Sequence, residues 1–123
     1  MTYNFKDILA WKKSHEFVLA IYKVTSGFPL HERFGLCSQF QRAAVSIPAN
    51  IAEGYKKISK ADKLRFLNIA QGSLEECRYY ILLSKDLTYI TENDYLNLNR
   101  RIDEVSYLLN AYCKGIIERK WND

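Results

Sequence analysis

Apolar residues recur along the chain at intervals of three and four positions, which is the spacing of residues on one face of an α-helix. This pattern predicts four helices, which run from about Asp7 to Ser26, from between Pro29 and Leu36 to about Tyr55, from Ser59 to about Leu87, and from Thr91 to near Trp121. Short connections between long helices favour antiparallel neighbours. The sequence therefore predicts an all-α fold, an antiparallel up-down four-helix bundle, with residues 1–123 forming a single domain.

The apolar rows differ between the predicted helices. The second helix carries a row through Leu36, Phe40, Ala43, Ile47 and Ile51, and the third helix one through Leu67, Ala70, Leu74, Cys77, Ile81 and Ser84. The last helix carries the most regular row, which consists of Tyr95, Leu98, Ile102, Val105, Leu109, Tyr112 and Ile116. The first helix carries two adjacent rows, one through Ile8, Trp11, His15, Val18, Tyr22 and Thr25 and the other through Ala10, Ser14, Phe17, Ile21 and Val24. The core of one bundle requires about one stripe per helix. The additional row therefore predicts packing between chains, and hence a homo-oligomer.

Several residues indicate where the helices begin, end or change. Ser59 and Thr91, each followed three positions later by Asp, are typical of helix N-caps. Gly27 is expected to adopt the left-handed conformation that ends a helix. Pro48 lies inside the second helix and is expected to bend or interrupt it. Gly72 lies in the middle of the third helix, where close packing against a neighbour is the expected reason for a glycine.

The composition supports a folded helical protein without a membrane span. Only 5 Gly and 2 Pro occur, fewer than a β-sandwich or barrel with many tight turns would require. No apolar run approaches the roughly 18 residues of a membrane-spanning helix. Residues 1–13 are polar and mixed, unlike a signal peptide, and Cys37, Cys77 and Cys113 are odd in number and widely spaced, as expected for reduced thiols. We therefore expect a cytoplasmic protein.

The residues that carry most enzyme chemistry are scarce. His15 and His31 are the two histidines, and His15 is expected on an apolar helix face, partly buried and hydrogen-bonded. The sequence contains no paired-cysteine metal motif, no phosphate-binding loop and no nucleophile elbow. We expect no enzymatic activity, no metal and no cofactor.

A row of polar side chains follows one face of the second helix, within a strip roughly 80° wide. The row consists of Gln39, Arg42, Ser46, Asn50, Glu53 and Lys57. One interpretation is a solvated face. We favour the other, a partly buried hydrogen-bond network between helices or between subunits, because short amides and a hydroxyl replace the Lys and Glu typical of a solvated face. This interpretation predicts that Arg42 and Glu53 are mostly buried and share a network with Asn50.

A cluster of basic residues lies at the junction of the second and third helices. It consists of Lys56, Lys57, Lys60, Lys63 and Arg65, which are opposed within these ten residues only by Asp62. The net charge is +4, and outside this cluster the basic and acidic residues cancel. Local positive charge of this kind is typical of a phosphate-binding surface. A solvated turn explains the cluster equally well.

Three stretches of the chain resemble one bacterial family. They are residues 5–13 (FKDILAWKK), residues 42–55, which include the run SIPANIAEG, and residues 66–76 (FLNIAQGSLEE). They resemble the 23S rRNA intervening-sequence proteins, and the resemblance extends from about residue 3 to residue 90. It implies a four-helix bundle that assembles as a homopentamer. A related bundle is the accessory variability protein of diversity-generating retroelements, which binds a reverse transcriptase and nucleic acid.

Two functions are consistent with these observations. The first is a non-catalytic oligomer, a pentamer by preference, that binds RNA or DNA through the basic junction. The alternative is an oligomeric scaffold that binds a protein partner without contacting nucleic acid.

Overall fold

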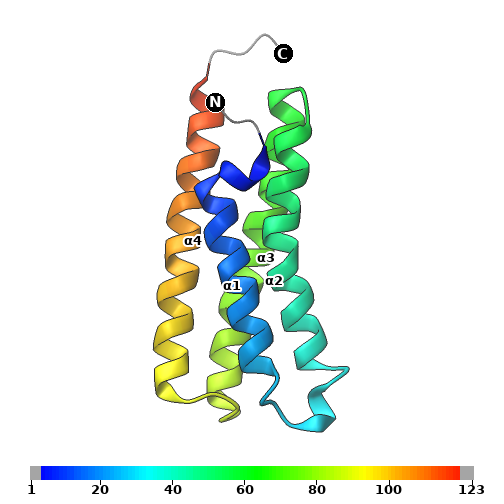
Figure 1. The fold of residues 1–123 in the computed structure, drawn as a ribbon, viewed down its shortest axis with the longest axis vertical. Coiled ribbons are helices and arrows are strands. Elements are labelled where there is room, and N and C mark those ends of the chain that lie inside the picture. Colours follow the sequence, from blue (N-terminus) through cyan, green and yellow to red (C-terminus); the bar gives the residue numbers. More distant parts are fainter. Residues whose placement is uncertain (1–3, 120–123) are drawn as a thin grey trace.

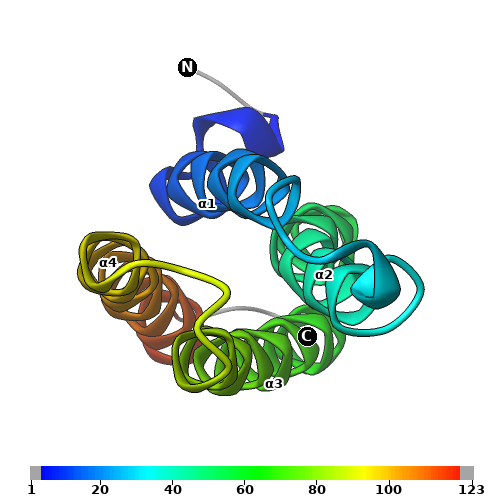
Figure 2. The ribbon, with the colours of Figure 1, turned by 90° about the horizontal axis from the view of Figure 1, so that it is seen from below.

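The computed structural model describes residues 4–119, and within them the chain forms four α-helices and no β-strand. The helices are α1 (Leu9–Thr25), α2 (Leu36–Lys56), α3 (Lys60–Asp86) and α4 (Glu92–Glu118), with 3-10 turns η1 (Phe5–Asp7) and η2 (Leu30–Glu32). Successive helices run in opposite directions (Figure 1) and form a ring in which α1 also contacts α4 (Figure 2). The predicted all-α four-helix bundle is confirmed. The predicted end of the last helix, near Trp121, lies outside the described residues.

The apolar rows of α2, α3 and α4 form the core. In α4, Ile102, Val105 and Leu109 are fully buried, and in α3 the row from Leu67 to Ser84 is buried throughout. The row of α2 is buried as well, and α2 continues through Pro48 without interruption. The three-four periodicity therefore predicted the core of these three helices correctly.

Helix α1 buries most of its row through Phe17 and Ile21, whereas its other row is buried only in part, at Val18 and Thr25. Phe17 and Ile21 are fully buried, whereas Tyr22 in the other row remains 48% exposed. His15 belongs to this second row and is also exposed, with its ring stacked on Trp11 at a centroid distance of 5.1 Å. The expectation that His15 is partly buried was wrong: Val18 and Thr25 of the same row are buried, but His15 remains exposed.

The helix ends match the sequence signals in part. The Ser59 hydroxyl accepts a hydrogen bond from the Asp62 N–H at 3.1 Å, and Thr91 forms a reciprocal capping box. Gly27 does not adopt the left-handed conformation expected of it. Instead, Thr88 at the end of α3 has a φ of 62°. Its N–H and that of the next residue donate to carbonyls of the last turn of α3, which closes the helix.

Glu32 joins the two loops at the end of the bundle opposite η1. One carboxylate oxygen accepts the N–H of Leu36 at the start of α2 at 3.1 Å, and the other accepts the hydroxyl of Tyr89 at 2.8 Å. These hydrogen bonds lower the pKa of Glu32. The α1–α2 loop is thereby fixed to the α3–α4 loop.

The two helical glycines of α2 and α3 lie in different surroundings. A Cβ atom on Gly54 would lie 3.1 Å from the carbonyl oxygen of Lys63 and 3.3 Å from the Cβ of Phe66, so glycine allows α2 and α3 to approach closely. A Cβ atom on Gly72 would meet no atom within 4 Å. The expectation of close packing at Gly72 was therefore wrong within one chain.

We predict opposite effects of substituting these glycines. Gly54→Leu should lower the free energy of unfolding by about 1–3 kcal/mol, because the larger side chain must push α3 away. Gly72→Ala should raise it by about 0.5–1 kcal/mol, because alanine restricts the unfolded chain and fits the helix. Urea unfolding followed by circular dichroism measures both changes. Equal effects of the two substitutions would contradict the assigned helix contact.

Candidate nucleic-acid interface

The predicted basic cluster spans the turn between α2 and α3. The first turn of α1 and the C-terminal end of α4 lie at the same end of the bundle (Figure 1). The structure therefore brings the five cluster residues to one end of the molecule. It does not give them equivalent roles.

Two of the five lysines and arginines bind backbone carbonyls. The ammonium group of Lys63 donates to the carbonyl oxygen of Tyr55 at 2.7 Å, in the last turn of α2. The ammonium group of Lys60 donates to the carbonyl oxygens of Ile117 at 3.2 Å and Arg119 at 2.9 Å, at the end of α4. Positive charge at a helix C-terminus is favourable, because the last carbonyls lack intrahelical partners. Lys60 and Lys63 are therefore engaged in holding helix ends.

Lys63 is also buried, with 8% of its surface exposed. Desolvation lowers the pKa of its ammonium group, and the nearby charge of Arg119 lowers it further. A cation in this position is poorly placed to reach an external phosphate.

The remaining three cluster residues face outward to different degrees. Lys56 is exposed. Arg65 is exposed too; it lies 3.5 Å from the carboxylate of Asp62 and over the ring of Phe66. Lys57 is about one-third exposed and lies 3.5 Å from the carboxylate of Glu53. Lys56 and Arg65 are thus the best-placed phosphate contacts of the predicted set.

The folded chain adds basic residues that are distant in sequence. Residues 4–12, 53–66 and 113–119 meet at this end and contain nine Lys and Arg against four Asp and Glu. The basic residues beyond the predicted cluster are Lys6, Lys12, Lys114 and Arg119. The described remainder of the chain carries a small negative net charge. We call this positively charged part of the molecule the basic end.

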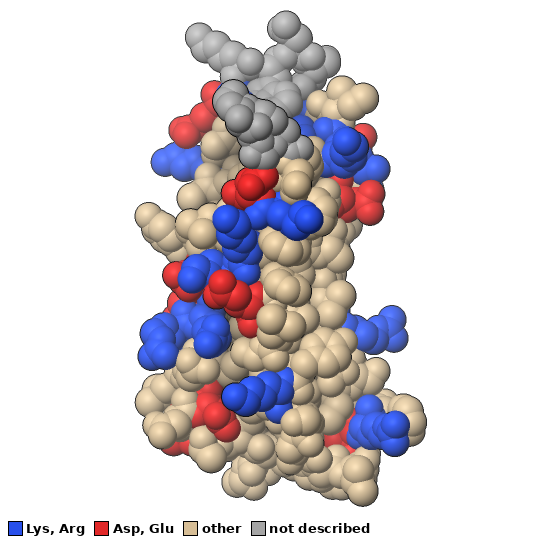
Figure 3. Space-filling model, in the orientation of Figure 1, with Lys and Arg blue, Asp and Glu red and all other residues tan. Residues whose placement is uncertain are grey.

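The sides of the bundle carry mixed charge. On the face shown in Figure 3, Lys and Arg side chains are interspersed with Asp and Glu. Three ion pairs of this kind are Lys13 with Glu104, Arg78 with Asp103, and Lys85 with Glu92. The excess of positive charge therefore belongs to the basic end rather than to a whole face.

The polar row of α2 forms hydrogen bonds with α3. The Ser73 hydroxyl donates to the Ser46 hydroxyl at 2.8 Å, and the Asn50 amide donates to Ser46 at 2.9 Å. Further along the row, the Tyr80 hydroxyl lies 3.0 Å from Gln39. Ser46 and Gln39 therefore hydrogen-bond to α3, whereas Asn50 joins this network through Ser46 within α2.

Arg42 and Glu53 differ from the prediction. Both are exposed, and Glu53 pairs with Lys57 rather than with Asn50. The expectation that they are mostly buried was wrong within one chain, because the polar row lies at the rim of the α2–α3 contact rather than inside it. Arg42 borders a shallow groove of about 380 Å³ between the two helices.

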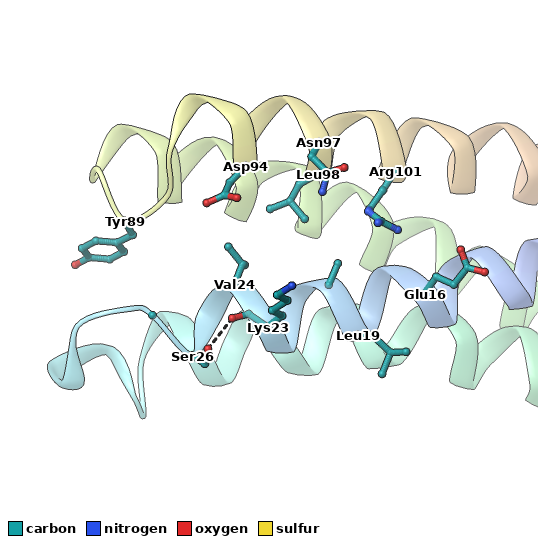
Figure 4. Close-up of a pocket in the computed structure, with 12 residues that line it drawn as sticks. Glu16, Leu19, Lys23, Val24, Ser26, Tyr89, Asp94, Asn97, Leu98 and Arg101 are labelled. Atoms are coloured by element: carbon teal, nitrogen blue, oxygen red, sulfur yellow. Dashed lines mark hydrogen bonds between the residues drawn. The ribbon is translucent and has the colours of Figure 1, made fainter.

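A larger groove of about 750 Å³ separates α1 from α4. Figure 4 shows Asp94, Leu98 and Arg101 projecting from α4 toward α1, with Val24 opposite them and Leu19 directed away from α4. The Nε atom of Arg101 is buried and has no hydrogen-bond partner in the described residues. The groove combines apolar side chains with a buried donor that lacks an acceptor.

The described part of the chain has neither a metal-binding cluster nor a membrane-spanning helix. Residues 4–119 contain no group of three His, Cys, Asp or Glu side chains arranged to hold a metal ion. None of the helices in this range is long and apolar enough to cross a membrane.

Residues 6–111 match the family described as 23S rRNA-intervening sequence protein. The chain belongs to this family. A crystal structure of a protein of unknown function from the S23 ribosomal protein family of Bacteroides thetaiotaomicron VPI-5482 is similar, with a TM-score of 0.80 and 32% sequence identity. The similarity covers 89% of this chain and 98% of that protein. No curated protein matches the chain.

The run SIPANIAEG, through which this intervening-sequence protein resembles its family, has a structural role here. Ile47 and Ile51 lie in the core, Ser46 and Asn50 bond at the rim, and Gly54 lies against α3. The run therefore supplies the surface that α2 presents to α3.

We predict that Lys63 stabilises the fold, whereas Lys56 does not. Lys63→Met should lower the free energy of unfolding by about 1–3 kcal/mol, because the carbonyl of Tyr55 loses its donor. Lys56→Met should change it by less than about 0.5 kcal/mol, since Lys56 is exposed. Thermal and urea unfolding of the two variants distinguish these roles. Equal stability of both variants would show that the Lys63 hydrogen bond contributes nothing.

Proposed function

We propose that this family member is a non-catalytic homo-oligomer that binds RNA or DNA through its basic end. The observation that carries the proposal is the nine-to-four excess of basic over acidic residues at that end. Lys56, Arg65 and Lys12 are exposed and supply charges for phosphate contacts. Such contacts depend little on base sequence, so we propose sequence-tolerant binding.

Oligomer formation is supported by the surface of α1 and the α1–α4 groove. Leu19 and Tyr22 are 58% and 48% exposed on α1, beside a groove that contains the unpartnered Nε atom of Arg101. A neighbouring chain would cover this exposed apolar surface. The family resemblance favours a pentamer. A ring of five chains would repeat the basic end and strengthen weak individual contacts.

The alternative function, a scaffold that binds a protein partner without contacting nucleic acid, is favoured by a different observation. Leu30 and Phe34 in the α1–α2 loop are 87% and 88% exposed, at the end opposite η1. Apolar side chains this exposed are typical of protein contacts. The proposal places this protein in the cytoplasm with either type of partner.

We predict a mass of five chains, each of 14.4 kDa, by light scattering at micromolar concentration. Leu19→Glu combined with Tyr22→Glu should dissociate the oligomer, because charges would replace the apolar surface of α1. Ile58→Glu, at a residue that is 91% exposed in the α2–α3 turn, is the matched control and should leave the mass unchanged. A single-chain mass for the parent protein would refute the oligomer.

We predict nucleic-acid binding that weakens steeply with salt. On a duplex, the logarithmic slope should be about 0.9 for each phosphate neutralised, because bound cations release counterions. Lys56→Glu combined with Arg65→Glu should reduce the affinity for nucleic acid by about tenfold or more. Filter binding to structured RNA at two salt concentrations measures both effects.

The matched control is Arg33→Glu combined with Lys85→Glu, which makes the same charge change at the opposite end. This control should bind like the parent protein. Equal losses in the two double variants would show that net charge alone matters. If the parent protein does not bind even at low salt, the scaffold function is favoured.

A further inference from the structure

A second groove opens at the basic end, between η1 and the last turns of α2. It has a volume of about 440 Å³, within the range of pockets that hold small ligands. The residues that line it are Asn4, Phe5, Ala49, Ala52, Glu53, Tyr55 and Lys56. Four of these seven residues are two aromatic residues and two alanines, and the small alanine side chains leave room between the rings.

Contacts elsewhere in the protein hold both aromatic residues in place. The Phe5 ring packs against Trp11 at 5.1 Å and 71°, and Trp11 in turn stacks on His15. Tyr55 is held from the other side by Lys63, whose ammonium group bonds its carbonyl and lies 5.7 Å from its ring centroid. Because the rings are positioned before any ligand arrives, a flat ligand would bind with little ordering cost.

The lining of this groove carries one basic and one acidic residue, Lys56 and Glu53, and it lies at the end of the molecule that has an excess of positive charge. Lys56 lines the groove and is exposed, and Lys6 from η1 is exposed at the same end. Aromatic rings beside lysines form the usual surface for single-stranded nucleic acid, in which a base stacks on a ring and phosphates contact the cations.

We propose that the groove between η1 and α2 binds an unpaired nucleobase, so that the nucleic acid recognised at the basic end is single-stranded. The inference rests on the proposed nucleic-acid binding and adds the class of substrate. A paired base is stacked within its duplex and must leave the stack to reach a pocket, whereas an unpaired base enters directly. The carboxylate of Glu53 and the amide of Asn4 also line the groove, and they would supply hydrogen-bonding groups for the polar edge of the base.

The test compares three probes of equal length at low salt: a single strand, the same strand with abasic sites, and a duplex. RNA and DNA versions of each are measured by fluorescence anisotropy. The parent protein should bind the intact single strand at least fivefold more tightly than the abasic strand, since stacking one base contributes about that much. The duplex should bind like the abasic strand.

Two variants remove the pocket by different means. Phe5→Ala removes one ring, and Ala52→Leu fills the groove; each should abolish the preference for intact bases and leave duplex affinity unchanged. Phe5 belongs to η1, which has no buried residue, so the bundle should remain folded. Phe34→Ala, at an exposed aromatic residue of the opposite end, is the matched control and should retain the preference.

The outcomes separate this inference from the proposed function. Binding to all three probes with equal affinity, unchanged by Phe5→Ala, would overturn the base pocket and leave phosphate binding in place. No binding to any probe would overturn both. A changed oligomer mass for Ala52→Leu in light scattering would show that a second chain occupies the groove, and would also overturn the pocket.

Discussion

The structure of the basic end depends on hydrogen bonds to the C-terminal carbonyl groups of α2 and α4. A helix leaves its last carbonyls without intrahelical partners, and here Lys63 and Lys60 supply the donors. Both lysines belong to the first turn of α3, so the start of one helix fixes the ends of two others. The close contact of Gly54 with α3 lies beside this arrangement, and Lys56 and Arg65 remain the exposed cations of the predicted cluster.

The sequence predicted the features that depend on local periodicity. The rows of α2, α3 and α4 became the core, because each helix meets neighbours on one side and the apolar stripe marks that side. The caps at Ser59 and Thr91 were also predictable, since their partners lie three residues away. Periodicity could not show which positions of the second α1 row face the core: Val18 is buried, whereas His15 is exposed.

The candidate site was less predictable, because its residues come together only in the folded chain. A window along the sequence found Lys56 and Arg65 but could not include Lys12 or Lys114, which reach the same end through other helices. The window also could not show that Lys63 is buried. The groove beside η1 leaves no signal in the sequence, because it pairs Phe5 with residues more than 40 positions away.

In an oligomer of a bundle that is charged at one end, the symmetry decides how close the charged ends lie to one another. In a cyclic ring whose axis follows the helices, every basic end points the same way, whereas a two-fold axis across the helices places the ends far apart. In such a ring the basic ends would lie beside one another, and salt would screen their repulsion only beyond a Debye length of about 8–10 Å. Repulsion at that rim would therefore oppose assembly. A bound polyanion neutralises the repulsion, and any ligand that prefers the assembled state stabilises it in proportion to that preference. In a ring of this kind, nucleic-acid binding and subunit assembly are therefore coupled, and the four acidic residues of the basic end reduce the repulsion that the free ring must tolerate.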